Sequence, residues 1–167
     1  MKTMRILFVL FLLAGGFGLS ACSDDDDDNP TNPGGGTDVD PWVGEWYMEG
    51  DNVPLVLTSF LNIKNVRVTM REDLTITTVE TDSSDAVTTR EGTYSVTLSS
   101  SGSIHAVTTN YNDSLAQEGI LEVVEGTPDV LKLELVPTGG TVPPATPATG
   151  FGTTAAAEGN VQRYERQ

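Results

Sequence analysis

The chain has 167 residues, a length typical of a single domain. Its 9 basic and 24 acidic residues give a formal net charge of −15, which argues against nucleic acid as a partner because phosphate backbones repel such a surface. Its only cysteine, Cys22, excludes an internal disulfide and a zinc site built from several cysteines.

The first 21 residues have the three parts of a secretory signal peptide. Lys2 and Arg5 form a basic start, residues 6–13 are an unbroken apolar run, and small residues follow at the exit. The apolar run is shorter than the roughly 20 residues that a transmembrane helix needs. Residues 1–21 are therefore predicted to be a leader that is removed from the mature chain.

The end of this leader reads Leu19-Ser20-Ala21-Cys22, which resembles the lipobox of bacterial lipoproteins. The resemblance implies that the Cys22 thiol is acylated and that the chain is then cut before Cys22. Two or three acyl chains, palmitate among them, would hold the mature chain on a membrane, because each buried CH₂ contributes about 0.8 kcal/mol. The alternative is an ordinary secretory signal with an incidental cysteine.

Residues 22–40 are predicted to be a disordered tether. Asp24 to Asp28 repel one another, and the Pro- and Gly-rich stretch that follows does not propagate regular structure. Acidic residues directly after a lipidated cysteine resemble the export signal of surface lipoproteins in the Bacteroidota. That resemblance implies an outer-membrane protein that faces the medium, with a periplasm-facing protein as the alternative.

From residue 41 to residue 167 the sequence predicts one all-β domain. Apolar and polar residues alternate with period two, which is typical of strands with one buried and one solvated face. The predicted strands are residues 42–48, 66–70, 74–79, 94–98, 104–107, 120–124, 130–136 and 161–166. Turn-forming residues separate them at 71–73, 82–85, 100–102, 110–113 and 126–128.

About eight or nine short strands at even spacing favour an antiparallel meander, either a sandwich or a closed barrel. We favour the barrel because closure removes the edge strands that would otherwise aggregate. Residues 53–63 fit either a further strand or a short helix that closes one end of the barrel.

Both ends of this domain resemble lipocalin-like barrels. Gly44-Glu45-Trp46 matches the Gly-x-Trp of their first strand, Gly92-Thr-Tyr94 matches a repeated Gly-x-Tyr, and residues 161–166 resemble their short last strand. The resemblance implies that Trp46 plugs the closed end of the barrel and that a late arginine, Arg163 or Arg166, packs across its indole ring.

The segment from 137 to 160 is a long loop of Pro, Gly, Thr and Ala in which Phe151 is the only large apolar residue. Loops longer than about 12–15 residues are usually functional or disordered. We favour a mobile surface insertion, and the alternative is a lid over the barrel mouth with Phe151 as its anchor.

No group of residues in the sequence indicates catalysis or metal binding. His105 is the only histidine, which excludes a metal site built from histidines, and the acids Glu118, Glu122 and Glu134 are not distinguished as a pair. No catalytic residue, metal ligand or cofactor is therefore expected. Asp113-Ser114-Leu115 resembles the acceptor motif of protein O-glycosylation in the Bacteroidota, which makes Ser114 a candidate for modification.

The sequence favours a binding module over an enzyme. An eight-stranded barrel has room for one small ligand, so the leading hypothesis is a membrane-anchored lipoprotein that binds a small apolar or amphipathic molecule. The alternative is a non-enzymatic structural or interaction lipoprotein of the cell envelope with a filled barrel core. The many Val, Leu and Ile residues favour the filled core slightly, and no ligand-binding residue is assigned from the sequence.

Overall fold

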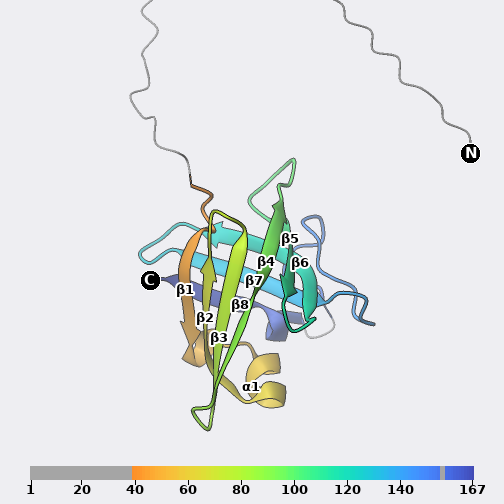
Figure 1. Cartoon of the computed structure of the whole chain (residues 1–167). Coiled ribbons are helices and arrows are strands. Elements are labelled where there is room, and N and C mark those ends of the chain that lie inside the picture. The colour runs from red at the N-terminus through yellow and green to blue at the C-terminus, as the bar shows by residue number, and fades with distance from the viewer. Residues whose placement is uncertain (1–38, 155–156) are drawn as a thin grey trace, which may run out of the picture. The chain divides into compact units, whose positions relative to one another are not determined.

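The chain folds into a closed antiparallel β-barrel. The computed structural model describes residues 39–154 and 157–167. Eight strands each pair with the next in sequence, and β1 (Gly44–Glu49) also pairs with β8 (Gln162–Arg166), which closes the sheet (Figure 1). The predicted all-β meander barrel is therefore confirmed, with eight strands.

The remaining elements follow in chain order with short connections. The other six strands are β2 (Ile63–Met70), β3 (Thr75–Asp82), β4 (Val87–Thr97), β5 (His105–Tyr111), β6 (Ala116–Val124) and β7 (Val130–Pro137). The described residues also form three short helices, which are η1 (Gly50–Asn52), α1 (Leu55–Leu61) and η2 (Ala157–Asn160). None of the helices in the described residues is long and apolar enough to cross a membrane.

The ambiguous segment at 53–63 forms the short helix α1, which corresponds to the second of its two expected structures. Pro54 precedes the helix with extended backbone, and Asn62 ends it in the left-handed conformation with a φ of 55°. No residue of α1 is fully buried. The helix therefore covers the end of the barrel without being part of its core.

The two ends of the barrel differ in how they are filled. The first described residues and the β2–β3 turn lie at one end, and α1 and the β3–β4 hairpin lie at the other (Figure 1). Three large inward side chains, Trp46, Leu121 and Leu131, are fully buried. They fill the barrel towards the end where the chain enters, which we call the closed end.

Two inward-facing glycines allow neighbouring strands to approach closely. A Cβ on Gly119 would lie 1.9 Å from the backbone oxygen of Glu134, and one on Gly92 would lie 2.1 Å from that of Asn110. Any side chain at these positions would push β6 from β7, or β4 from β5. The tight curvature of the barrel at these two points therefore depends on glycine.

The long loop between β7 and β8 packs against the outside of the barrel. Glu134, which faces outward on β7, is completely buried and accepts hydrogen bonds from the backbone N–H groups of Gly152 (2.7 Å) and Thr154 (3.1 Å). Phe151 lies 5.7 Å from the ammonium of Lys132, also on β7. Phe151 therefore packs on the outer face of the barrel, and the described part of the loop contributes no residue beyond Pro137 to the barrel interior.

Candidate functional site

The barrel contains a cavity of about 250 Å³ whose lining includes two side chains of α1. It also reaches Met70 and Ile76, on either side of the β2–β3 turn, beside the large side chains of the closed end. The slight preference of the sequence for a filled interior therefore holds for only part of the barrel. We call this hollow the barrel cavity and the end next to α1 its mouth.

One side of the barrel cavity is apolar. Val66, Val68 and Met70 of β2 alternate inward and are almost completely buried, because their strand keeps a strict period of two. Leu133 and Leu135 of β7 line the opposite wall. Leu57 and Leu61 of α1 add apolar surface at the mouth.

The wall formed by β3, β4 and β5 becomes polar towards the mouth. The inward residues of β3 are Ile76, then Thr78, then Glu80, counted from the closed end. The Thr78 hydroxyl forms a hydrogen bond of 2.9 Å with the hydroxyl of Tyr111 on β5. Burial raises the pKa of Tyr111, so this hydroxyl stays neutral across the physiological range.

Two glutamine side chains continue the polar lining on other strands. Gln162 of β8 accepts a hydrogen bond of 2.6 Å from the hydroxyl of Tyr164, which is itself buried. Burial raises the pKa of Tyr164 well above its ordinary value. Gln117 of β6 accepts a long hydrogen bond of 3.5 Å from the Thr109 hydroxyl. Both glutamines line the barrel cavity.

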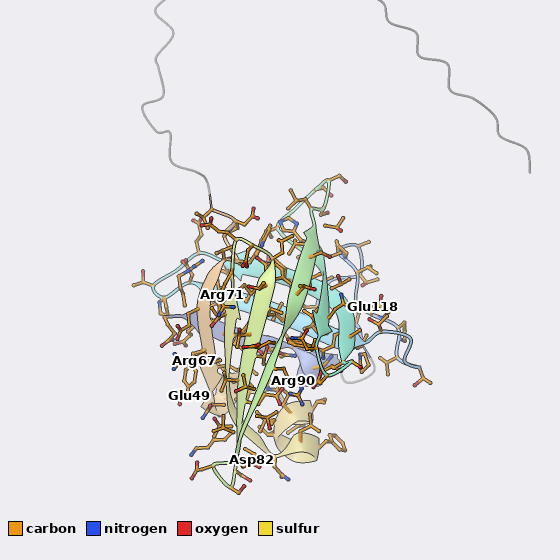
Figure 2. The ribbon with its side chains drawn as sticks, in the orientation of Figure 1. Glu49, Arg67, Arg71, Asp82, Arg90 and Glu118 are labelled. Carbon is orange, nitrogen blue, oxygen red and sulfur yellow. The ribbon has the colours of Figure 1, made fainter. Side chains whose placement is uncertain are left out.

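An arginine flanked by two acids lies at the mouth. Arg90 forms ion pairs with Glu80 on β3 and, at 3.0 Å, with Asp113 in the β5–β6 turn. The hydrogen bond with Glu80 is the largest cause of a raised pKa at Arg90. Figure 2 shows Arg90 on β4, in the half of the barrel towards α1. Two carboxylates against one guanidinium give this group a net charge of −1.

At the closed end the structure places Arg166, and not Arg163, over the Trp46 ring, 4.1 Å from its centroid. Arg166 also donates hydrogen bonds to Asp129 (3.0 Å) and to the Val43 carbonyl (3.0 Å). A Cβ on Gly44 would lie 2.8 Å from the guanidinium of Arg166, and the φ of Gly44 is 143°. Both observations explain why the first position of Gly-x-Trp is a glycine and not a residue with a side chain.

Arg163 has a different position. Its guanidinium forms an ion pair of 3.2 Å with Glu158 at the surface, and both side chains are well exposed. Because β-strand side chains alternate, Arg163 and Arg166 face opposite sides of β8, and only one of them can cover the barrel end.

The other residues singled out from the sequence lie away from the barrel cavity. Ser114 is exposed in the β5–β6 turn with a φ of 73°. His105 accepts a hydrogen bond of 3.2 Å from the Ser99 N–H and packs edge-on against Trp42, so its contacts are structural. Cys22 and the rest of the predicted leader lie outside the described residues, as does the tether up to residue 38.

The three candidate acids face outward and do not gather at a cleft. Glu122 pairs with Lys132 at 3.0 Å, and hydrogen bonding from Ser103 lowers the pKa of Glu122. Glu134 holds the long loop, and Glu118 lies on the outer side of β6 (Figure 2). Within residues 39–154 and 157–167, no three His, Cys, Asp or Glu side chains are grouped as metal ligands would be.

The sequence analysis missed the residues that make the barrel cavity polar. It began the fourth strand at residue 94, ended the fifth at 107 and began the sixth at 120, whereas the strands include Arg90, Tyr111 and Gln117. These inward residues are polar, so apolar–polar alternation stops where the cavity begins. The β-branched run at residues 87–89 and the Gly-Thr-Tyr at 92–94 were the signals from which the longer strand β4 could have been predicted.

Comparison with known proteins gives no relative. The chain matches no family model, no curated protein and no solved structure. Functional inference therefore depends on the geometry of the barrel.

Proposed function

We propose that this protein binds one small apolar or amphipathic molecule inside its barrel. The observation that supports the proposal is the cavity of about 250 Å³, lined by apolar side chains on β2, β7 and α1 and by polar ones on β3 to β6. A mostly apolar cavity with a few converging polar groups is the usual form of a small-molecule site. The proposal involves no catalysis and no cofactor.

The Trp46–Arg166 contact supports a further proposal, that the domain is a lipocalin-like barrel. A ring stacked under a guanidinium and a glycine that makes room for it close one end, which leaves the other end for a ligand. Because one fold serves many functions, the ligand has to be argued from the barrel cavity.

A second candidate is a structural or interaction protein of the cell envelope. Leu55, Phe60 and Leu61 of α1 are exposed by 58 to 79%, which is unusual for large apolar side chains and would suit contact with another protein. In that case the barrel cavity would stay empty of any ligand. The two candidates are separated by direct detection of a bound molecule.

Native mass spectrometry on residues 39–167 tests the leading proposal, since this segment has its own closed sheet and its own core. After incubation with extracts of envelope lipids and cell-wall glycans, we expect one discrete added mass that disappears on denaturation. Val66→Phe narrows the cavity and should reduce the adduct. The control Val79→Phe makes the same change on the outer face and should keep it.

Either of two results would contradict ligand binding in the barrel. One is a clean unliganded mass with every extract, which would favour the structural candidate. The other is an adduct that is as abundant in Val66→Phe as in the unaltered protein while the thermal unfolding curve of the variant shows a folded protein, because the ligand would then lie outside the cavity.

We also propose that the mature chain is anchored in the outer membrane through a lipid on Cys22 and faces the medium. The supporting residues are the lipobox at 19–22 and the acidic run Asp24 to Asp28. Metabolic labelling with an alkynyl fatty acid should mark the protein and Ser23→Ala, but not Cys22→Ser. Protease treatment of intact cells should remove the domain, and replacing the five aspartates with asparagine should protect it.

Labelling of Cys22→Ser would contradict the anchor. Protection of the unaltered protein in intact cells would support the periplasm-facing alternative. Intact mass measurement of the same material also tests Ser114 for a glycan, which Ser114→Ala would remove.

A further inference from the structure

We infer that the barrel cavity binds a neutral ligand and rejects the carboxylate of the same shape. The ligand class is a molecule of about ten non-hydrogen atoms with an apolar body and one neutral hydrogen-bond acceptor, such as an amide, a ketone or an alcohol. This inference rests on the proposed ligand-binding function and specifies its ligand.

The size of the barrel cavity sets the size of the ligand. A dry cavity of roughly 150 Å³ is enough for one benzene molecule, so the 250 Å³ here corresponds to about ten non-hydrogen atoms. Binding sites for drug-sized ligands begin near 300 Å³. A long-chain lipid would therefore extend through the mouth, whereas a chain of about eight carbons fits inside.

Several hydrogen-bond donors in the cavity remain free. The oxygen of Gln162 already accepts from Tyr164, which leaves its amide nitrogen to donate. Among the described residues, neither Gln162 nor Gln117 donates a hydrogen bond from its amide nitrogen to another residue. The hydrogen bond between the Thr78 and Tyr111 hydroxyls uses one of their two hydrogens, so the other hydrogen can be donated to a ligand. These donors need an acceptor once a ligand displaces water.

The charged groups of the cavity explain the rejection of a carboxylate. Glu80 and Arg90 are the charged residues among the described residues that line the cavity. Arg90 forms ion pairs with both Glu80 and Asp113. A bound carboxylate would meet a group of net charge −1 and no free cation, and burying an uncompensated charge costs far more than burying a neutral group. The same net charge of −1 would attract an ammonium, so the charges at the mouth discriminate against the carboxylate and not against a cation.

The test is a matched series of three eight-carbon probes on residues 39–167 at neutral pH. Octanamide, octanoate and octylammonium have nearly the same shape and differ in charge. Isothermal titration calorimetry should show octanamide binding at least about tenfold more tightly than octanoate, and octylammonium, which the net charge of −1 attracts, should also bind more tightly than octanoate. Ethylbenzene, which has no head group, serves as the apolar reference and should bind more weakly than octanamide.

A double variant tests the charge at the mouth directly. Glu80→Gln with Asp113→Asn leaves Arg90 without its two acids, so the ratio of the octanoate to the octanamide dissociation constant should fall by about tenfold. The control is Glu118→Gln with Glu125→Gln, which removes one acid from the outer face of β6 and one from the turn that follows β6 at the closed end. The control should leave that ratio as it is in the unaltered protein.

The outcomes separate this inference from the proposed function. If octanoate binds as tightly as octanamide, or if both double variants change the ratio equally, the inference is wrong and ligand binding stands. If ethylbenzene binds but octanamide does not, the inference that the ligand carries a polar head group is wrong, and the proposal that the cavity binds an apolar molecule stands. If none of the probes binds to folded protein, the proposed function and the inference both fail.

Discussion

At the scale of single residues, the closed end depends on one side chain that makes several contacts at once. Arg166 stacks over Trp46 and donates to Asp129, to the Val43 carbonyl and to the Pro41 carbonyl. A guanidinium is planar and has five donors in a fixed arrangement, so it can do all of this from one position. A lysine ammonium has the same charge but neither the plane nor the arrangement.

We therefore predict that Arg166→Lys lowers the free energy of unfolding by about 2 kcal/mol, measured by urea denaturation. The control is Arg163→Lys on the same strand, which should cost less than about 0.5 kcal/mol because its ion pair with Glu158 is exposed. Equal losses in the two variants would show that the Arg166 contacts do not stabilise the closed end.

Gly119 sets a steric limit at the same scale. We predict that Gly119→Ala lowers the free energy of unfolding by at least about 2 kcal/mol, because its Cβ would lie 1.9 Å from the Glu134 oxygen and β6 and β7 would have to separate. Gly159→Ala places its Cβ 3.8 Å from Leu55 and should change stability by less than about 0.5 kcal/mol. A tolerated Gly119→Ala would mean that the barrel wall is less rigid than the structure indicates.

At the scale of elements, the loop between β7 and β8 shows how a segment without strands or long helices is held in place. Glu134 presents its carboxylate to the Gly152 and Thr154 N–H groups, and Asn160 donates to the Leu135 carbonyl at 3.0 Å. Hydrogen bonds to a charged group in a buried site are stronger than neutral ones. This part of the loop is thereby fixed to the outer face of the barrel.

We predict that Glu134→Gln releases this loop without opening the barrel. An amide has one acceptor oxygen, so one of the two N–H groups loses its partner, and amide hydrogen exchange at Gly152 and Thr154 should accelerate by at least about tenfold. Exchange in β2 and β3 should not change. Glu118→Gln on the outer side of β6 is the control, and similar exchange in both variants would argue against the carboxylate as the anchor.

At the scale of the whole molecule, buried tyrosines link the stability of the barrel to alkaline pH. Burial raises the pKa values of Tyr94, Tyr111 and Tyr164 above the ordinary value of 10.0. In the unfolded chain these hydroxyls ionise near pH 10, whereas in the folded barrel they stay neutral to higher pH. Their contribution to stability is thus fully present below pH 10 and is lost as the pH rises towards the folded-state pKa values.

We predict that the free energy of unfolding falls above pH 10, by up to about 1.4 kcal/mol per pH unit for each such tyrosine. Urea denaturation at pH 8, 10 and 11 measures this loss. Tyr111→Phe should show a smaller decrease between pH 10 and pH 11 than the unaltered protein, whatever its stability at pH 8. The same slope in both proteins would show that Tyr111 ionises equally in the folded and unfolded states.

The barrel as a whole was predictable because most of its strands bury one face. On β2 the residues Val66, Val68 and Met70 alternate with polar ones, and turn residues such as Asp82 to Asp85 mark where the chain reverses. Local pattern and local turn chemistry fix these elements, and neither depends on distant contacts. The Trp46 ring and a late arginine became candidates for one end through the resemblance to lipocalin-like barrels and not through these local patterns.

The sequence by itself thus determined the all-β class, the order of the strands and the closure of the meander. Only the tertiary structure decided that Arg166 rather than Arg163 covers Trp46, that the long loop packs on the outside of the barrel, and that the barrel contains a cavity next to α1. The physical reason for missing the cavity is that some residues lining it, such as Arg90, Tyr111 and Gln117, are polar although they face inward. Their strands therefore lack the alternation of apolar and polar residues by which a half-buried strand is recognised in a sequence. Which side chains meet across a closed sheet depends on register between strands far apart in sequence, and no local pattern encodes that register.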